Sequence, residues 1–209
     1  MSAPHILNHP VIDDYMAKLR YKECSPEDFR RFVRQIAMLM VPYATSNLPT
    51  RSCSVDTPLE TASTRVLDEP LILCPILRAG LGLLDGFLTL LPQASVAHIG
   101  LARNEETLTP EPYYFNCPSR LSEAEVIVLD PMLATGGSAS EAISELKKHG
   151  AKKLRFVCIV AAPEGLDTLQ SNHPDVPVLA ANLDRGLNEH GYILPGLGDA
   201  GDRIFGTEA

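Results

Sequence analysis

The sequence lacks any apolar run long enough to cross a membrane. Its apolar runs, such as Leu71 to Leu77, are far shorter than the roughly 20 residues that a transmembrane helix needs. The first residues also lack the charged segment and apolar core that are typical of a secretory signal. We therefore expect a cytoplasmic protein with no membrane partner.

Cysteine is scarce, and its spacing suggests no pairing. The chain has five cysteines, an odd number, and none lies in a Cys-x-x-Cys pair. This pattern predicts neither disulfides nor zinc and is typical of a reducing compartment. The histidines lack metal-ligand spacing, so His149, His173 and His190 are expected to be structural or exposed. A Ser-His-Asp arrangement is not evident either.

Positive charge is in short supply. Lys and Arg number 18 against 26 Asp and Glu, which gives a formal net charge of −8. This acidic balance argues against a nucleic-acid partner, although a local basic patch could still exist. A length of 209 residues with 45% hydrophobic content, without a repeat or linker, predicts one domain spanning residues 1–209.

The most informative stretch runs from Val126 to Ser138. Val126 to Leu129 is a continuous apolar run, mostly β-branched, and predicts a parallel strand covered on both faces. Pro131 restricts Asp130 to extended geometry, so its carboxylate is expected at the carboxyl end of that strand. Apolar residues recur at helical spacing from Ser138 onward. We therefore expect Thr135 to Ser138, in the loop after Asp130, to lie at the first turn of a helix.

That loop has the chemistry of an anion site. The first N–H groups of a helix have no partner within it and carry partial positive charge, so they can hold a phosphate. Gly136 and Gly137 allow close approach, Thr135 and Ser138 add hydroxyl donors, and Asp130 can accept hydrogen bonds from sugar hydroxyls. The competing interpretation is a plain strand-to-helix turn. The combination of groups favours a phosphosugar site.

Two common phosphate motifs are missing from this loop. The loop from Asp130 to Ser138 carries neither G-x-G-x-x-G nor G-x-x-x-x-G-K-[ST], which disfavours a dinucleotide fold and a P-loop at this helix start. The form acidic-Pro-x-x-Ala-Thr-Gly-Gly-Ser, at residues 130–138, instead resembles the phosphoribosyl-pyrophosphate motif of type I phosphoribosyltransferases. Within that family it is most similar to the uracil phosphoribosyltransferases.

The other segments predict an α/β fold with a doubly wound, mainly parallel sheet. The resemblance adds a small hood, formed by the amino-terminal helices and the carboxyl-terminal loop, together with a β-arm and a flap. Pro42 should kink or end the second helix. Helices are expected at Val11–Tyr21, from Pro26 to about Pro42, after Gly80 through Leu90 and at Pro163–Gln170. Strands are expected at Leu71–Leu77, Ser95–Leu101, Tyr113–Phe115, Leu154–Ala161 and Val176–Ala181, and a β-hairpin arm within Leu48–Leu67.

A second anion subsite is expected around Arg78. This residue follows a buried strand, and the small residues Ala79 and Gly80 leave room beside it; the alternative is a surface salt bridge. Residues 75–80 match the pyrophosphate loop of the family throughout. Arg103 opens an Arg-Asn-Glu-Glu-Thr stretch that would otherwise be solvated surface. In the family this stretch lies on a flap whose Arg closes over the pyrophosphate.

The carboxyl-terminal stretch, residues 188–203, carries a third signal. Its closely spaced glycines expose backbone around Asp199, with Tyr192 and Ile193 as apolar walls, whereas the competing interpretation is a surface tail. Exposed N–H and C=O groups can read the alternating acceptors and donor of a uracil edge. The stretch resembles the Tyr-Ile-x-Pro-Gly-x-Gly-Asp-x-Gly-Asp-Arg signature of the uracil phosphoribosyltransferases.

The resemblance implies a pentosyl transfer from 5-phosphoribosyl pyrophosphate (PRPP) to uracil, giving UMP and pyrophosphate in pyrimidine salvage. It also implies Mg²⁺ carried by the substrate rather than by protein ligands, and at least a homodimer. It leaves open whether GTP acts as an allosteric effector. The implied catalytic residues are Asp130, Arg103 and Asp199; the implied PRPP ligands are Arg78, Arg103, Asp130, Pro131, Met132, Leu133, Ala134, Thr135, Gly136, Gly137, Ser138 and Asp199; and the implied uracil ligands are Tyr192, Ile193, Gly198, Asp199 and Ala200.

Two alternatives stay open at this point. The first is a catalytically weak regulator that senses uridine nucleotides and binds RNA, against which the acidic balance argues. The second is a transferase for another base, from which the carboxyl-terminal loop separates the main interpretation.

Overall fold

A computed structural model describes residues 3–103 and 110–207. Its main sheet has the strand order β1-β11-β10-β8-β4-β6-β7, in which neighbours pair in parallel except for the antiparallel pair β6–β7. Two short strands lie outside this order: β5 pairs with β4, and β9 pairs with β10. The bounds are β1 His5–Ile6, β4 Leu71–Leu77, β5 Ser95–Val96, β6 His98–Arg103, β7 Pro110–Asn116, β8 Glu125–Leu129, β9 Met132–Leu133, β10 Lys153–Ala161 and β11 Val178–Leu183.

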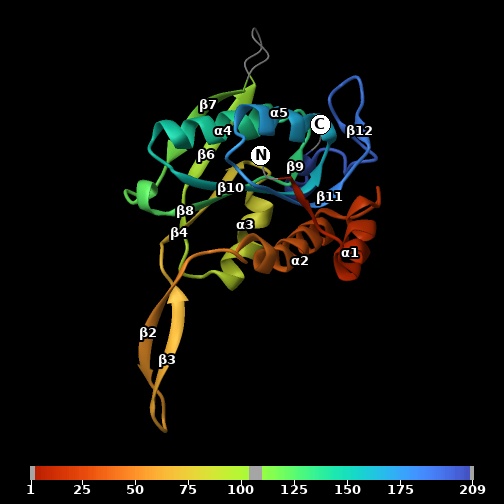
Figure 1. The fold of residues 1–209 in the computed structure, drawn as a ribbon. Helices are drawn as coiled ribbons and strands as arrows, with labels where there is room; N and C mark the ends of the chain where they lie inside the picture. The colour runs from red at the N-terminus through yellow and green to blue at the C-terminus, as the bar shows by residue number, and fades with distance from the viewer. Residues whose placement is uncertain (1–2, 104–109, 208–209) are drawn as a thin grey trace.

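Helices cover both faces of this sheet (Figure 1). One face carries α1, α2 and α3, and the other carries α4 and α5. The short helix α6 lies with the first group, because its Ile204 belongs to the same apolar cluster as α1 to α3. The bounds are α1 Pro10–Arg20, α2 Pro26–Ala44, α3 Leu81–Leu90, α4 Gly137–Lys148, α5 Pro163–Asn172 and α6 Ala200–Phe205, with one turn of 3-10 helix at Leu121–Glu123.

The continuous apolar strands result from this layered arrangement. In β8, Val126 and Val128 belong to the cluster under α4 and α5, whereas Ile127 and Leu129 belong to the cluster under α1 to α3. Successive side chains of a strand point to opposite faces, so a strand with helices on both sides must be apolar at every position. The prediction of a doubly wound, mainly parallel sheet is therefore confirmed.

The second helix begins as expected but does not end at Pro42. The Ser25 hydroxyl accepts a hydrogen bond from the Asp28 N–H at 3.1 Å, and Pro26 occupies the first turn. The helix continues past Pro42 to Ala44, so of the two outcomes expected for Pro42, an end of the helix is wrong and a kink stays a prediction. A proline so near the end removes a single N–H donor, and tertiary packing of Met40, Val41 and Ala44 in the core offsets that loss.

The predicted hairpin arm is present, as β2 Thr50–Asp56 paired with β3 Thr61–Leu67. Figure 1 shows it projecting away from the sheet and the helices. The strand expected at Ser95–Leu101 divides into β5 and β6, and the one expected at Tyr113–Phe115 is the middle of the edge strand β7. Within the described ranges, no helix combines the length and the apolar character that a membrane crossing requires.

Candidate active site at the carboxyl ends of β4 and β8

Two predicted ligand loops leave the sheet side by side. Strands β4 and β8 are parallel neighbours, and Pro75 of the first pairs with Leu129 of the second. Parallel strands end at the same edge, so the loop that carries Arg78 lies next to the loop that begins at Asp130. A side chain at Gly80 would collide with the carbonyl oxygen of Leu129, so only glycine permits this close approach of the two loops.

Asp130 ends β8 in a desolvated position. Its backbone N–H donates to the Val157 carbonyl at 3.2 Å, and its Oδ1 lies 3.4 Å from the Met132 N–H. Burial of the carboxyl group raises the pKa of Asp130 to about 7, although the hydrogen bond from Met132 lowers it. The ionised form of this group is therefore costly, and a further polar partner would stabilise it.

The loop after Asp130 has the predicted form of an anion site. Strand β9 anchors its first part to β10, and α4 begins at Gly137. Gly136 has a φ of 82°, and a methyl group there would lie 2.8 Å from the Gly165 carbonyl oxygen and 2.9 Å from Cβ of Thr168. The amino-terminal part of α5 thus packs against the loop, which aims the unpaired amides of α4 at the site.

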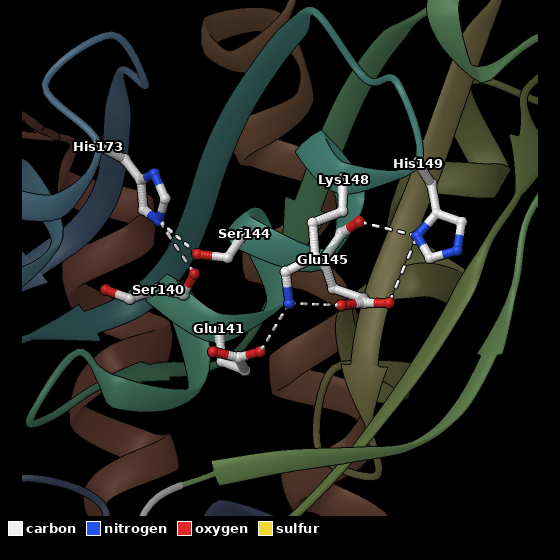
Figure 2. A network of polar contacts seen from close by, with 7 residues as sticks. All are labelled: Ser140, Glu141, Ser144, Glu145, Lys148, His149 and His173. Atoms are coloured by element: carbon white, nitrogen blue, oxygen red, sulfur yellow. Dashed lines mark hydrogen bonds and ion pairs between the residues drawn. The ribbon is translucent and has the colours of Figure 1, made fainter.

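Helix α4 is fixed by polar contacts along its length (Figure 2). Nε2 of the buried His173, which follows α5, lies 3.0 Å from the Ser140 carbonyl oxygen and 3.3 Å from the Ser144 hydroxyl. At the other end, His149 Nδ1 lies 2.9 Å from the Glu145 carbonyl oxygen, and its ring stacks on Phe115 of β7. These contacts give the two histidines packing roles and hold the start of α4 in place.

Arg78 begins the loop that follows β4, and the Leu77–Arg78 peptide is cis. Its guanidinium is 3.6 Å from the Asp202 carboxylate and 5.8 Å from the centre of the Phe205 ring, both of them in α6. The side chain is 59% exposed, so this ion pair is weak and can exchange for a ligand. Arg78 is thus an accessible cation beside the loop of Asp130.

The carboxyl-terminal segment spans both loops. A methyl group on Gly191 would lie 3.6 Å from Cγ2 of Thr135, and one on Gly201 would lie 4.0 Å from Cβ of Ala79. The segment forms a small hairpin, β12 Gly186–Leu187 with β13 Ile193–Leu194, and then the helix α6. Residues separated by more than a hundred positions therefore meet at one edge of the sheet.

The predicted base-binding residues lie on this segment with different exposure. Ile193 and Ala200 are buried, whereas Tyr192 is 45% exposed. Asp199 caps α6, and its Oδ1 accepts a hydrogen bond from the Asp202 N–H at 2.9 Å. The predicted carboxyl-terminal loop is followed by helix α6 from Ala200 onward.

Arg103 is placed only through its backbone, as the last residue of β6. Residues 104–109 of the expected flap lie outside the described residues. The predicted closure of Arg103 over a pyrophosphate stays a prediction.

Comparison with known proteins agrees with this geometry. A family model described as uracil phosphoribosyltransferase matches residues 6–207. The chain belongs to this family. It is 51% identical over its full length to the uracil phosphoribosyltransferase of Variovorax paradoxus (strain S110), of which it covers 100%. It is 52% identical to that of Dictyoglomus thermophilum, over 97% of this chain and 99% of the relative.

Solved structures show the same fold. The AQ2163 protein from Aquifex aeolicus superposes with a TM-score of 0.93 at 36% identity, covering 99% of this chain and 100% of that one. A purine phosphoribosyltransferase from Pyrococcus horikoshii Ot3 reaches a TM-score of 0.53 at 15% identity, over 74% and 84% of the two chains. The second likeness shows the type I phosphoribosyltransferase fold alone.

Sequence reasoning missed several residues that shape this uracil phosphoribosyltransferase site. Asp202 contacts Arg78, and Glu164 accepts a hydrogen bond from the Leu187 N–H at 3.1 Å. Buried Asp184, which directly follows β11, pairs with Arg20 of α1. The signal for Asp184 was available, because it follows a buried strand as Asp130 does.

Asp130→Asn is expected to stabilise the unliganded protein in a pH-dependent way. The folded chain binds the Asp130 proton more tightly than the unfolded chain does, since the pKa rises from 3.8 to about 7. Stability present below about pH 4 is therefore lost as the pH rises to about 7. The advantage of the Asn variant in melting temperature should grow over that range and level off above it. An advantage that is the same at every pH would contradict this.

Gly136→Ala is expected to weaken PRPP binding by about tenfold or more. The added methyl group is strained at a left-handed φ and collides with the Gly165 carbonyl oxygen, so the loop must move away from its phosphate-binding geometry. Isothermal calorimetry measures the affinity. The control is Gly150→Ala, at the far end of α4, where φ is 97° but the nearest heavy atom, Cβ of Ser122, is 3.9 Å away. The control should lose stability and keep its PRPP affinity; equal affinities in both variants would refute the anion site.

Proposed function

We propose that this protein transfers the phosphoribosyl group of PRPP to uracil, giving UMP and pyrophosphate, and so serves pyrimidine salvage. The observation that carries the proposal is the meeting of three segments at one edge of the sheet: the amides of α4, the loop of Arg78 and the glycine-rich carboxyl-terminal segment. Together they offer a cradle for a sugar phosphate, a cation for a diphosphate and exposed backbone for a flat base.

The reaction breaks the bond between the sugar C1 and the pyrophosphate oxygen and forms a bond from C1 to a uracil ring nitrogen, which loses its proton. Positive charge develops on the sugar and negative charge on the leaving group. Arg78 and Arg103 stabilise the leaving group through preorganised charge, without a covalent intermediate. Asp130 holds the ribose hydroxyls, which provide the polar partners that its desolvated carboxylate lacks. Asp199 offsets the charge on the sugar.

The 5-phosphate of the substrate binds the loop from Pro131 to Ser138. What supports this assignment is the geometry of that loop: β9 fixes its start, Gly136 turns it, and α4 presents its first amides there. Thr135 and Ser138 add hydroxyl donors to these amides. A phosphate held in this way needs no lysine.

Uracil is read by the segment from Tyr192 to Ala200. Its backbone can match the acceptor, donor and acceptor of the base edge, with Ile193 as a buried apolar wall. Cytosine replaces one acceptor by an amino donor and leaves groups unpaired, at a cost of about 1–3 kcal/mol each.

Magnesium fits this site as an ion carried by the substrate. Mg²⁺ typically keeps several waters and binds substrate phosphates, with one or two carboxylates at most, and Asp199 would position such an ion beside the diphosphate. When bound, the ion neutralises charge on the diphosphate. In the part of the chain that the structure describes, no group of three or more His, Cys, Asp or Glu side chains could hold a metal ion by itself.

A homo-oligomer in the cytoplasm is also part of the proposal. The β2–β3 arm exposes Val55 and Leu59, the latter to 95%, and an isolated hairpin is marginally stable in water without a partner surface. All five cysteines are free, as expected in a reducing compartment. Sedimentation that gives a monomer at every concentration would contradict the oligomer.

We include GTP as an effector in the proposal. What supports it is a hollow of about 620 Å³ between α2, α3 and α6, lined by Arg30, Arg31 and Arg34, which suits a triphosphate on an otherwise acidic protein. Phe205, whose ring lies near Arg78, also lines the hollow. Activity unchanged by GTP at any PRPP concentration would remove this part.

The decisive test is a panel of bases with PRPP and Mg²⁺, read by pyrophosphate release. Uracil should support turnover, whereas cytosine, hypoxanthine and adenine should not. Release with another base alone would assign a different transferase. Absence of release with every base, together with RNA retention in a filter-binding assay, would instead favour an RNA-binding regulator.

Arg78→Ala should cost about 1.5–3 kcal/mol in UMP pyrophosphorolysis, because pyrophosphate loses a charged hydrogen-bonding partner. The matched control is Arg120→Ala, which removes an exposed arginine that pairs with Glu123 away from the site. The control should keep the wild-type rate. A change of less than about twofold in the Arg78 variant, or equal losses in both, would reject Arg78 as a pyrophosphate ligand.

A further inference from the structure

Helix α1 and the end of β11 meet in a buried ion pair. Arg20 Nη2 lies 2.7 Å from Asp184 Oδ1, and Arg20 Nη1 lies 2.8 Å from Asp184 Oδ2, so the pair is bidentate. The Asp184 side chain is only 3% exposed. Such a forked pair fixes both distance and orientation, unlike a single contact between flexible side chains.

The same pair binds the backbone of Gly196 on both sides. The Gly196 N–H donates to Asp184 Oδ2 at 2.8 Å, and the Gly196 carbonyl accepts from Arg20 Nη1 at 2.8 Å. Asn182 donates to Asp184 Oδ1 at 2.7 Å. Burial alone would raise the pKa of Asp184, but the bonds from Arg20, Gly196 and Asn182 outweigh it and lower the pKa. The carboxylate is therefore ionised when it holds the glycine.

Gly196 lies inside the segment proposed to read uracil. It follows the cis Leu194–Pro195 peptide, has a φ of 62° and precedes Gly198. Because both of its backbone polar groups are already bonded to the ion pair, we assign Gly196 no contact with the base. Its fixed orientation instead sets the direction in which the chain leaves toward Gly198 and Ala200.

We propose that Arg20 and Asp184 are positioning residues that determine uracil affinity and base selectivity by fixing the peptide of Gly196. This inference rests on the proposed function, because it assumes that the segment around Gly196 binds the base. Neither side chain needs to contact the substrate. Their effect is to preorganise the backbone donors and acceptors of the segment. If the segment is displaced, its match to uracil weakens and its discrimination against cytosine falls.

A purely structural ion pair is the competing explanation, and the chain contains a matched control. Arg155 and Glu125 also form a partly buried pair, at 3.0 Å with side chains 13% and 12% exposed, and Arg155 likewise donates to a backbone carbonyl, that of Ala44. Glu125 is the first residue of β8, so this pair lies at the amino ends of the strands, opposite the site.

The experiment compares Asp184→Asn, Arg20→Lys and Glu125→Gln in the full-length protein, using pyrophosphate release and melting temperature. Asp184→Asn should raise the KM for uracil about tenfold, leave the KM for PRPP within about twofold, and lower the preference for uracil over cytosine. Arg20→Lys keeps the charge but loses the fork, so its shift should be smaller in the same direction. Glu125→Gln should lose thermal stability and keep wild-type uracil kinetics.

Three outcomes would overturn the inference. The KM for uracil could stay unchanged in both Asp184→Asn and Arg20→Lys, the KM for PRPP could rise in parallel with it, or Glu125→Gln could shift the KM for uracil by the same factor. If Asp184→Asn does not fold, Arg20→Lys carries the same comparison. A wild-type protein that releases no pyrophosphate with uracil would instead refute the proposed function, so the two failures are distinguishable.

Discussion

The parallel pairing of β4 with β8 is the constraint on which the site depends. It brings the loop of Arg78 and the loop of Asp130 to the same edge, and the contact between Gly80 and the Leu129 carbonyl brings them as close as two backbones can lie. Every other part of the site is placed relative to these two loops. Helix α4 begins at the second of these loops, and the carboxyl-terminal segment contacts both of them.

This arrangement conflicts with the stability of the empty protein. A carboxylate at the end of a buried strand is poorly solvated, and the raised pKa of Asp130 is the direct consequence. A substrate that donates hydroxyl hydrogen bonds relieves the conflict, so part of the binding energy comes from repairing an unfavourable site. Asp184 is also buried, but its arginine, amide and backbone partners keep its pKa low. Several protein groups serve as its polar partners, whereas the protein partner that the structure shows for the Asp130 carboxylate is the Met132 N–H at 3.4 Å.

Much of the fold followed from local pattern. The apolar run of Val126 to Leu129, the cap at Ser25 and the paired strands of the arm are each set by residues close together in the chain. Apolar periodicity alone was insufficient in two places. Core packing, which depends on distant contacts, carries α2 past Pro42, whereas the turn from Asp199 into α6 is stabilised by a local cap. Local periodicity does not contain these terms, since it sees neither the tertiary neighbours nor the cap geometry.

The sequence alone determined the chemistry of the site: an acidic residue before a glycine-rich helix start, an arginine after a buried strand and a glycine-rich tail. Those residue types act through backbone geometry that a few neighbours impose. Only the tertiary structure decided that Arg20 reaches Asp184 and Gly196, and that Asp202 reaches Arg78. These contacts join segments far apart in the chain, and their formation depends on how the helices pack against the sheet, which no local pattern encodes.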